Sequence, residues 1–340
     1  MAELKIIELA LQGGGAHGAY TWGVLDQLLA DPRIRIEGLS GTSAGAMNAV
    51  VLADGLHCGG ESAAREALQD FWAAVSRAAM ASPIRRTPLD WWLGRWSLDY
   101  SPGYLAMDFL SRVASPYQLN PLNFNPLRDI LVKQVNFESV RSCPYIKLFV
   151  TATNVRSGKA RVFRKEELSA DAVLASACLP FLFKAVEIDG EAYWDGGYMG
   201  NPSLFPLLEE CGGRDILIVQ INPIQRDEVP TSAAAIMNRL NEITFNASLI
   251  KDIGAIASLK RTMEAGGSTE PACWRDVRFH RISADHELRD LSVSSKLNAE
   301  WAFLIHLRDI GRASAEHWLE RNFDALGERS TLDIDAVYLN

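Results

Sequence analysis

Two stretches near the amino terminus decide the fold of this chain: KIIELALQGGGAHG at residues 5–18 and IRIEGLSGTSAG at residues 34–45. In each, an apolar run of strand length leads into a tight glycine turn, and a helical pattern of apolar residues follows. The first helical pattern stops at Asp31-Pro32, because proline does not continue a helix. Strand, turn and helix repeated in this order predict an α/β domain with a largely parallel sheet.

The rest of the chain continues this alternation, apart from one irregular segment. Residues 83–125 are dense in proline, tryptophan and tyrosine without a clean period, which indicates a cap-like insertion. A hairpin is expected around Asp189-Gly190, a strong turn dipeptide. The predicted strands cover 145–155, 160–163, 184–195, 215–222 and 277–282, and the predicted helices cover 61–80, 232–264 and 295–325. Since neither a linker nor a repeat divides the sequence, we expect one α/β domain with a helical C-terminal extension packed on it.

Composition narrows the function classes. The chain has 340 residues, 48% hydrophobic and 22% charged, as in soluble globular proteins. The formal net charge of 34 − 42 = −8 argues against nucleic-acid binding, which needs a basic face. We find neither a signal peptide nor an apolar run of the ~18 residues that span a membrane, so a cytoplasmic location is expected. The cysteines are scattered and odd in number, which argues against a disulfide framework and a zinc site. They are Cys58, Cys143, Cys178, Cys211 and Cys273.

The pentapeptide at residues 41–45 has the G-x-S-x-G pattern and sits where a strand ends and a helix begins. A serine on such a sharp turn needs neighbours without side chains, which Gly41 and Gly45 supply. The turn lifts the hydroxyl to a helix N-terminus, whose dipole favours developing negative charge. We therefore interpret Ser43 as a nucleophile. The alternative is a serine that only caps the helix.

The run GGGAHG at residues 13–18 leaves backbone N–H groups exposed at the start of a helix, where they can bind an anion. One interpretation is an oxyanion hole, and another is a dinucleotide fingerprint, because the letters also satisfy G-x-G-x-x-G. The dinucleotide interpretation expects an acidic residue at the end of the second strand, where this chain has GTSAG with only Glu37 nearby. It also leaves Ser43 unexplained. A role in packing alone is the third alternative.

The motif Asp195-Gly196-Gly197 ends the predicted hairpin and offers a base for Ser43. Alone, it is a common turn. None of the six histidines has a supporting motif, and only two strands precede Ser43, which disfavours an α/β-hydrolase triad. Neither HExxH nor a Cys/His cluster is present, so no metal site is expected.

The three motifs GGGAHG, GTSAG and DGG, in this order, resemble those of the patatin-like phospholipase family. Ala175-Ser176 with Pro180 before the hairpin and Asn201-Pro202 after DGG match as well. The resemblance covers roughly residues 5–223 and implies a three-layer α/β/α fold with a mainly parallel central sheet. It implies a catalytic domain over 5–223, with 83–125 as the insertion, and a mostly helical extension over 224–340.

The resemblance also implies a Ser-Asp dyad without a catalytic histidine, in which Ser43 is the nucleophile and Asp195 the base. Because a free aspartate has a pKa of ~3.9, it is a weak base unless it is aimed at the hydroxyl and desolvated. The implied oxyanion donors are Gly13, Gly14 and Gly15, and the supporting turn residues are Gly41, Gly45, Gly196 and Gly197.

The implied activity is hydrolysis of carboxylic esters in phospholipids or related lipids through an acyl-Ser43 intermediate, without a cofactor. A lysophospholipase, thioesterase or general esterase with the same dyad is the alternative among hydrolases. From other classes, the alternatives are a nucleotide-binding oxidoreductase and a catalytically silent lipid-binding protein. The sequence predicts no oligomeric state.

Residues 85–96 concentrate aromatic and basic side chains in an acidic chain. They include Trp91, Trp92 and Trp96 with Arg85, Arg86 and Arg95. These residue types suit a lipid–water interface and predict peripheral membrane contact through 85–96; the alternative is that the tryptophans fill the core of the cap. In the later helix, Met237, Leu240, Ile243 and Phe245 are predicted to be core residues.

Overall fold

The computed structural model describes residues 4–265 and 276–339. Its centre is an eight-stranded sheet in the order β5-β6-β3-β2-β1-β7-β8, with β4 pairing with β3. The strands are β1 (Lys5–Leu11), β2 (Ile34–Gly41), β3 (Lys147–Asn154), β4 (Ala160–Arg164), β5 (Val186–Ile188), β6 (Glu191–Asp195), β7 (Asp215–Gln220) and β8 (Arg278–Ser283). The five strands from β3 to β8 are mutually parallel, and β4, β5 and β6 add antiparallel pairs at one edge. The predicted mainly parallel sheet is confirmed.

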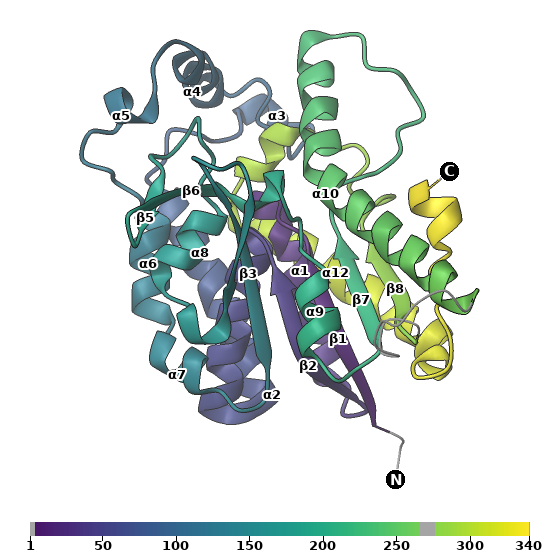
Figure 1. The fold of residues 1–340 in the computed structure, drawn as a ribbon. Coiled ribbons are helices and arrows are strands. Elements are labelled where there is room, and N and C mark those ends of the chain that lie inside the picture. The colour runs from purple at the N-terminus through teal and green to yellow at the C-terminus, as the bar shows by residue number, and fades with distance from the viewer. Residues whose placement is uncertain (1–3, 266–275, 340) are drawn as a thin grey trace.

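Helices cover both faces of the sheet (Figure 1). They are α1 (Gly18–Ala30), α2 (Ala44–Ala79), α3 (Pro88–Trp92), α4 (Pro102–Val113), α5 (Pro116–Leu119), α6 (Pro126–Gln134), α7 (Phe137–Ser142), α8 (Ala170–Ser176), α9 (Phe205–Glu210), α10 (Ala233–Glu264) and α12 (Trp301–Asn322). Short turns are η1 (Gly15–His17), η2 (Lys165–Glu167), η3 (Gly196–Tyr198), η4 (Val293–Leu297), η5 (Phe323–Ala325) and the π-helical η6 (Asp335–Leu339). None of the helices within 4–265 and 276–339 has both the length and the apolar content to cross a bilayer.

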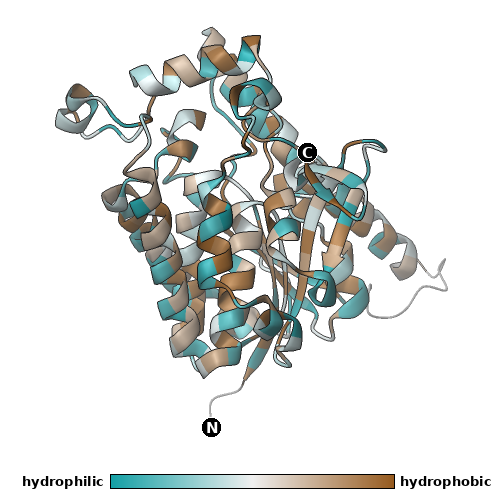
Figure 2. Ribbon diagram, turned by 90° about the vertical axis from the view of Figure 1, so that its left-hand side faces the viewer, coloured by the Kyte–Doolittle hydropathy of each residue, from teal (hydrophilic) through white to brown (hydrophobic). Residues whose placement is uncertain are grey.

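Side chains of β1 alternate between the two faces of the sheet, and each face packs against a layer of helices. Ile7, Leu9 and Leu11 pack into a large core with α1, α2 and α12 on one face, whereas Ala10 joins a smaller core with α9 and α10 on the other. Strands buried on both faces read as continuous apolar runs, and Figure 2 shows these hydrophobic strands at the centre. The α/β/α arrangement expected from the resemblance is therefore confirmed.

Local turns mostly follow the predictions. The β5–β6 hairpin turns at Asp189 and Gly190, which both have positive φ angles, as a tight two-residue turn requires. The two helices predicted after Ser43 form one long α2 that is interrupted at Gly59 and Gly60, where the backbone leaves helical angles. Cys58, Cys143, Cys178 and Cys211 are free thiols, and Cys273 lies outside the described residues.

The segment 83–125 lies beyond the carboxyl ends of the parallel strands and contains α3, α4 and α5. The first turns of α10 rise opposite α4, on the other side of the sheet edge (Figure 1). The prediction of core positions at Met237, Leu240 and Ile243 is wrong, because each of these side chains is about half exposed; Phe245 is buried as predicted. This amino-terminal part of α10 extends past the sheet, so its apolar residues have no layer to pack against.

Candidate active site

Ser43 lies between β2 and α2 in a strained turn. Its φ of 54° and ψ of −119° lie outside the regions that a serine normally adopts. The Ser43 N–H donates to Ser176 Oγ at 2.9 Å, which holds the turn from the side of α8. A Cβ at Gly45 would lie 2.3 Å from the Leu11 carbonyl oxygen, so only glycine lets α2 start this close to β1. The serine therefore stands at a helix N-terminus in a fixed orientation.

Asp195 reaches the same edge at the end of β6, which runs antiparallel to β3 on the side away from β2. In β6 it pairs with Ala152 of β3, while Val150 of β3 pairs with Gly41 of β2, so β6 ends level with the Ser43 turn. The Asp195 N–H donates to the Cys178 carbonyl oxygen at 2.8 Å, which fixes the backbone. Both Ser43 and Asp195 line one cavity.

The Asp195 carboxyl is almost fully buried, and its surroundings set its basicity. Burial raises its pKa from 3.8 to about 7, while the Gly197 N–H, the Ser43 hydroxyl and the Lys296 ammonium lower it by smaller amounts. Gly197 N–H donates to Oδ1 at 2.7 Å. Among the described residues, Oδ2 has no partner with hydrogen-bond geometry. A buried carboxylate with a pKa near neutrality is suited to general-base catalysis.

The glycine loop at 13–15 faces Ser43, but its three glycines differ. The Gly13 N–H donates to Asn201 Oδ1 at 2.7 Å, so it is already engaged within the protein. Gly14 and Gly15 line the cavity beside Ser43. Gly15 has a φ of 59°, and a Cβ there would lie 2.4 Å from the Lys296 carbonyl oxygen. The structure thus points to Gly14 and Gly15, rather than Gly13, as the loop residues open to a ligand.

The four supporting glycines lie where other atoms approach closely: backbone at Gly41, Gly45 and Gly196, and the Phe245 ring at Gly197. A Cβ at any of them would come within 2.7 Å of another atom. Replacement by any other residue would therefore displace the turns that carry Ser43 and Asp195.

Histidines are not paired with Ser43. His17, although next to the glycine loop, contacts Ser295 Oγ through Nε2 at 2.8 Å, and burial lowers its pKa to about 3. His280 contacts Asp215 at 2.9 Å, at the amino end of β7 and away from the site. The cavity has no histidine among its described lining residues. Nor does any group of three His, Cys, Asp or Glu side chains within 4–265 and 276–339 suit a metal ion; metal independence remains a prediction.

The cavity has a volume of about 560 Å³, with a polar base and three polar side chains of α4, Asp108, Ser111 and Arg112, in its wall. The base holds Ser43, Asp195, Gly14, Gly15 and Lys296. The walls are mostly apolar and come from α2, α4, α10 and the loop before β5. They include Met47, Phe71, Trp72, Met107, Leu179, Phe181, Leu182, Phe183, Met237 and Phe245. A cavity with mostly apolar walls above a candidate nucleophile suits an acyl chain.

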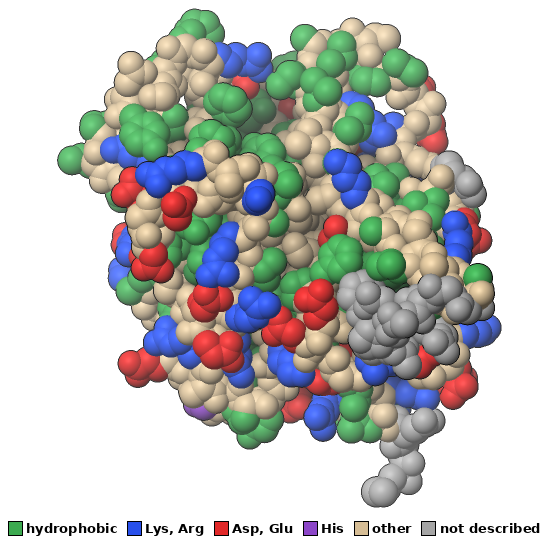
Figure 3. Space-filling view, viewed as in Figure 1, with side chains coloured by type: hydrophobic (Ala, Val, Ile, Leu, Met, Phe, Trp, Pro, Cys, Tyr) green, Lys and Arg blue, Asp and Glu red, His purple; other side chains and the backbone are tan. Residues whose placement is uncertain are grey.

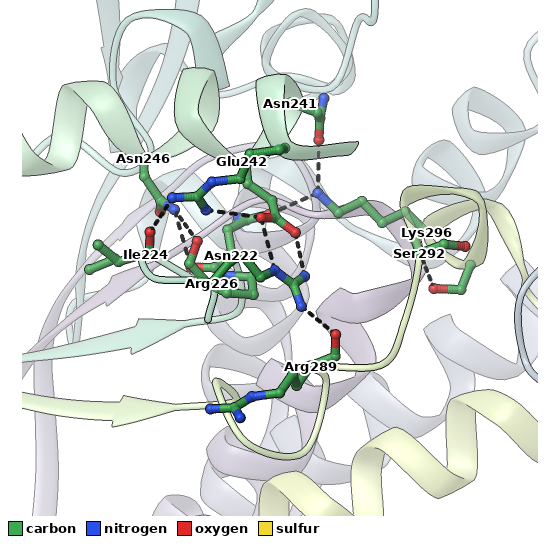
Figure 4. A network of polar contacts seen from close by, with 12 residues as sticks. Asn222, Ile224, Arg226, Asn241, Glu242, Asn246, Arg289, Ser292 and Lys296 are labelled. Atoms are coloured by element: carbon green, nitrogen blue, oxygen red, sulfur yellow. Dashed lines mark hydrogen bonds and ion pairs between the residues drawn. The ribbon is translucent and has the colours of Figure 1, made fainter. Parts of the chain in front are cut away.

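Sequence reasoning missed the buried polar residues that brace this base. Gln12, Asn201, Asn222 and Asn246 are fully or almost fully buried and hydrogen-bonded around the glycine loop. Lys296 joins them from η4, more than 270 residues after the loop (Figure 4). Gln12 directly after β1 and Asn222 two residues after β7 follow apolar strands at the carboxyl edge, a signal that could have found them. Lys296 has no such signal.

The family comparison can now be set beside this geometry. The family model for patatin-like phospholipase matches residues 9–208, more than half of the chain. The chain belongs to the patatin-like phospholipase family. Membership supports lipid hydrolase activity for this patatin-like phospholipase, and it covers the three motifs that carry Ser43, Asp195 and the glycine loop.

Two solved structures are similar to this patatin-like phospholipase at low identity. One is VipD from Legionella pneumophila, with 16% identity, a TM-score of 0.38, and coverage of 90% of this chain and 67% of that chain. The other is the heterodimeric ExoU–SpcU complex from the type III secretion system of Pseudomonas aeruginosa, with 17% identity, a TM-score of 0.31, and coverage of 96% and 62%. Similarities this distant carry no argument about activity. No curated protein matches the sequence.

Proposed function

We propose that this patatin-like phospholipase cleaves carboxylic esters of lipids through a Ser-Asp dyad. Asp195 removes the proton from Ser43 Oγ as the oxygen attacks the ester carbonyl. The N–H groups of Gly14 and Gly15 stabilise the oxyanion, and the alcohol leaves with the proton from Asp195. Water, activated by Asp195, then releases the fatty acid from acyl-Ser43. The observation that carries this proposal is the shared cavity base, where a strained serine lies beside a buried carboxylate with a pKa of about 7.

The dyad is tested with Ser43→Ala and Asp195→Asn, assayed on a soluble short-chain ester and on phospholipid vesicles. Each variant should lower kcat by several orders of magnitude while the circular dichroism spectrum stays unchanged. A fluorophosphonate probe should label the wild type and leave Ser43→Ala unlabelled. Wild-type activity in folded Ser43→Ala would reject the assignment.

The cavity supports acyl-ester chemistry over dinucleotide binding. A dinucleotide needs an acidic residue at the end of β2 for its ribose, and here that position continues into Gly41 and the serine turn. The mostly apolar walls suit a fatty acyl chain better than a ribose and a pyrophosphate. Within the hydrolases, mass spectrometry of products from a lipid extract distinguishes a phospholipase from a lysophospholipase, thioesterase or general esterase.

We also propose that the protein meets its substrate at a membrane surface. Figure 3 shows hydrophobic side chains on two lobes that flank a hollow at the top of the molecule. On the α3 side, Trp91 and Trp92 are 71% and 77% exposed. Trp96, in contrast, stacks on Phe303 with ring centroids 5.1 Å apart. The predicted aromatic island is thus divided into an exposed pair suited to a lipid interface and one structural tryptophan.

Paired substitutions test this surface. Trp91→Ala with Trp92→Ala should weaken binding to anionic vesicles at least tenfold and leave the melting temperature and soluble-ester hydrolysis unchanged, because the two side chains pack on little else. Trp96→Ala is the matched control and should lower the melting temperature instead. Unchanged vesicle binding by the double variant would reject the membrane role without affecting the dyad.

A further inference from the structure

The cavity base contains a buried ammonium group that the dyad mechanism does not use. Lys296 is partly buried at the base of the cavity, and its Nζ donates to Asn222 Oδ1 at 2.8 Å and to Asn241 Oδ1 at 3.0 Å (Figure 4). Both of these partners are neutral amides. Removing an ammonium group from water is costly, and amide oxygens offset that cost less than a carboxylate does. A buried cation held in this way is oriented for negative charge that develops during a reaction.

A chain of hydrogen bonds leads from this ammonium group to the glycine loop. Asn222 accepts from Lys296 through Oδ1, and its Nδ2 donates to the Gly13 carbonyl oxygen at 2.9 Å. That carbonyl belongs to the peptide unit whose N–H is the Gly14 amide. The ammonium is therefore two hydrogen bonds from the peptide that presents Gly14 to the cavity.

The direction of this chain is fixed by chemistry. Lys296 Nζ only donates and the Gly13 carbonyl only accepts, so the Asn222 amide must present Oδ1 to the lysine and Nδ2 to the loop. Gln12 Oε1 accepts from the Asn222 backbone N–H at 3.0 Å and from Nδ2 at 3.2 Å, which keeps the amide from rotating. On the other side of the loop, Asn201 Oδ1 holds the Gly13 N–H.

We propose that Lys296 and Asn222 are positioning residues that transmit positive charge to the Gly13–Gly14 peptide unit and thereby strengthen the Gly14 N–H as an oxyanion donor. This inference rests on the proposed ester hydrolysis at Ser43. Hydrogen bonds in series polarise one another in a low-dielectric interior. An N–H therefore becomes a better donor when the carbonyl of its own peptide unit accepts from an amide that is itself polarised by an ammonium group. The stabilisation grows as the ester oxygen becomes an anion, so it favours the transition state over the bound ester.

In the part of the chain that the structure describes, the charged groups around Lys296 do not form a direct ion pair that would neutralise its ammonium group. Glu242 faces it from α10, but Arg226 binds that carboxylate and Arg239 lies 3.1 Å from it. Asp195 faces it from β6, and His17 lies nearby in its neutral form. Burial is the largest influence on Lys296 and lowers its pKa to about 8. Deprotonation of the lysine should therefore reduce kcat above about pH 8 in the wild type.

The experiment compares Lys296→Met and Asn222→Asp with the wild type on a soluble p-nitrophenyl ester. Methionine keeps the length of the lysine without its charge, and aspartate keeps the shape of asparagine without the donor to Gly13. Each variant should lower kcat about 10- to 100-fold with KM nearly unchanged, less than the roughly 10²–10³-fold loss on removing a whole oxyanion donor. The inhibition constant of an alkyl boronic acid, which forms a tetrahedral anion on serine, should rise by a similar factor. In Lys296→Met the decline above pH 8 should disappear.

The matched control is Lys260→Met, which removes a partly buried lysine whose Nζ donates to the Val277 carbonyl, away from the cavity. It should leave kcat and boronate affinity unchanged. Because the two positioning residues act in one chain, Lys296→Met with Asn222→Asp should lose no more than about twofold beyond the larger single loss. Three results would overturn this relay from Lys296 through Asn222 to the loop. They are a double variant whose loss in kcat equals the product of the two single losses, unchanged boronate affinity in folded Lys296→Met, and an effect on KM alone. If Ser43→Ala is inactive in the same assay, such a result rejects the relay alone; if Ser43→Ala is active, the proposed hydrolysis fails.

Discussion

Replacing the candidate base should make this protein more stable at the same time as it removes activity. Burial raises the pKa of Asp195 from 3.8 to about 7, so the folded state holds this proton more tightly than the unfolded state does. Stability is therefore lost as the pH rises from about 4 to 7, and the loss is constant above pH 7. The full shift of about three units corresponds to about 4 kcal/mol, since each unit equals about 1.36 kcal/mol.

Asp195→Asn removes this titration while keeping the shape of the side chain and the acceptor for the Gly197 N–H. As the pH rises from 5 to 8, the free energy of unfolding of the variant should increase by about 3 kcal/mol relative to that of the wild type. About two of the three pKa units by which Asp195 is shifted fall in this window. With an unfolding entropy of about 2.1 cal/mol/K per residue, this difference raises the melting temperature of the variant by roughly 4 °C relative to the wild type. Differential scanning fluorimetry of both proteins across this pH range measures how far the difference between their melting temperatures, the stability gap, widens.

The matched control is Asp252→Asn on α10, another carboxyl whose pKa burial raises, here to about 6. It should show a smaller widening of the stability gap and keep full ester hydrolysis. In the wild type, kcat/KM should rise with pH up to about 7 as Asp195 ionises. A stability gap between Asp195→Asn and the wild type that stays constant from pH 5 to pH 8 would refute the reasoning about buried charge.

Three further outcomes are expected. Gly15→Ala should lower the melting temperature by several degrees and abolish activity, because its Cβ would lie 2.4 Å from the Lys296 carbonyl at a φ of 59°; Gly158→Ala, with a φ of 67° and open space around it, should cost only the roughly 1–2 kcal/mol of the backbone angle. His17→Ala should keep appreciable activity and lose stability, because its ring contacts Ser295 and is not among the cavity-lining residues; loss of activity without destabilisation would contradict this. Dialysis against EDTA should leave soluble-ester hydrolysis unchanged, and activity lost on chelation and restored by a divalent ion would disprove metal independence.

The sequence predicts most of the fold because its signals are local. The strand at 5–11, the turn at residues 41–45 and the hairpin around Asp189-Gly190 each depend on a few neighbouring residues with distinct preferences. Glycine at both turns and a serine between strand and helix also identify the candidate nucleophile. These features need no knowledge of tertiary contacts.

The braces of the site are not local, and the sequence therefore does not reveal them. Lys296 approaches Gly15 and Asn222 from η4, whereas the sequence predicts that this position begins a helix over 295–325; the observed α12 starts only at Trp301. Similarly, the helical period of α10 predicts one buried face along its whole length, but only the part that overlies the sheet has a partner. Leu240 has the right spacing for a core position and is half exposed, because the sheet ends below it.

The candidate site concentrates destabilising features, and the apolar layers of the fold supply the stability that offsets them. Ser43 holds an unfavourable backbone angle, Asp195 carries a buried carboxylate, and Lys296 carries a buried ammonium. All three are destabilising features, and all three meet at one edge of the sheet. The apolar cores on both faces of β1 and β7 offset these free-energy costs. Three of the bracing residues, Asn222, Asn246 and Lys296, come from the chain beyond the family match at 9–208. The region that completes the sheet with β7 and β8 therefore also supports the glycine loop that carries the proposed oxyanion donors.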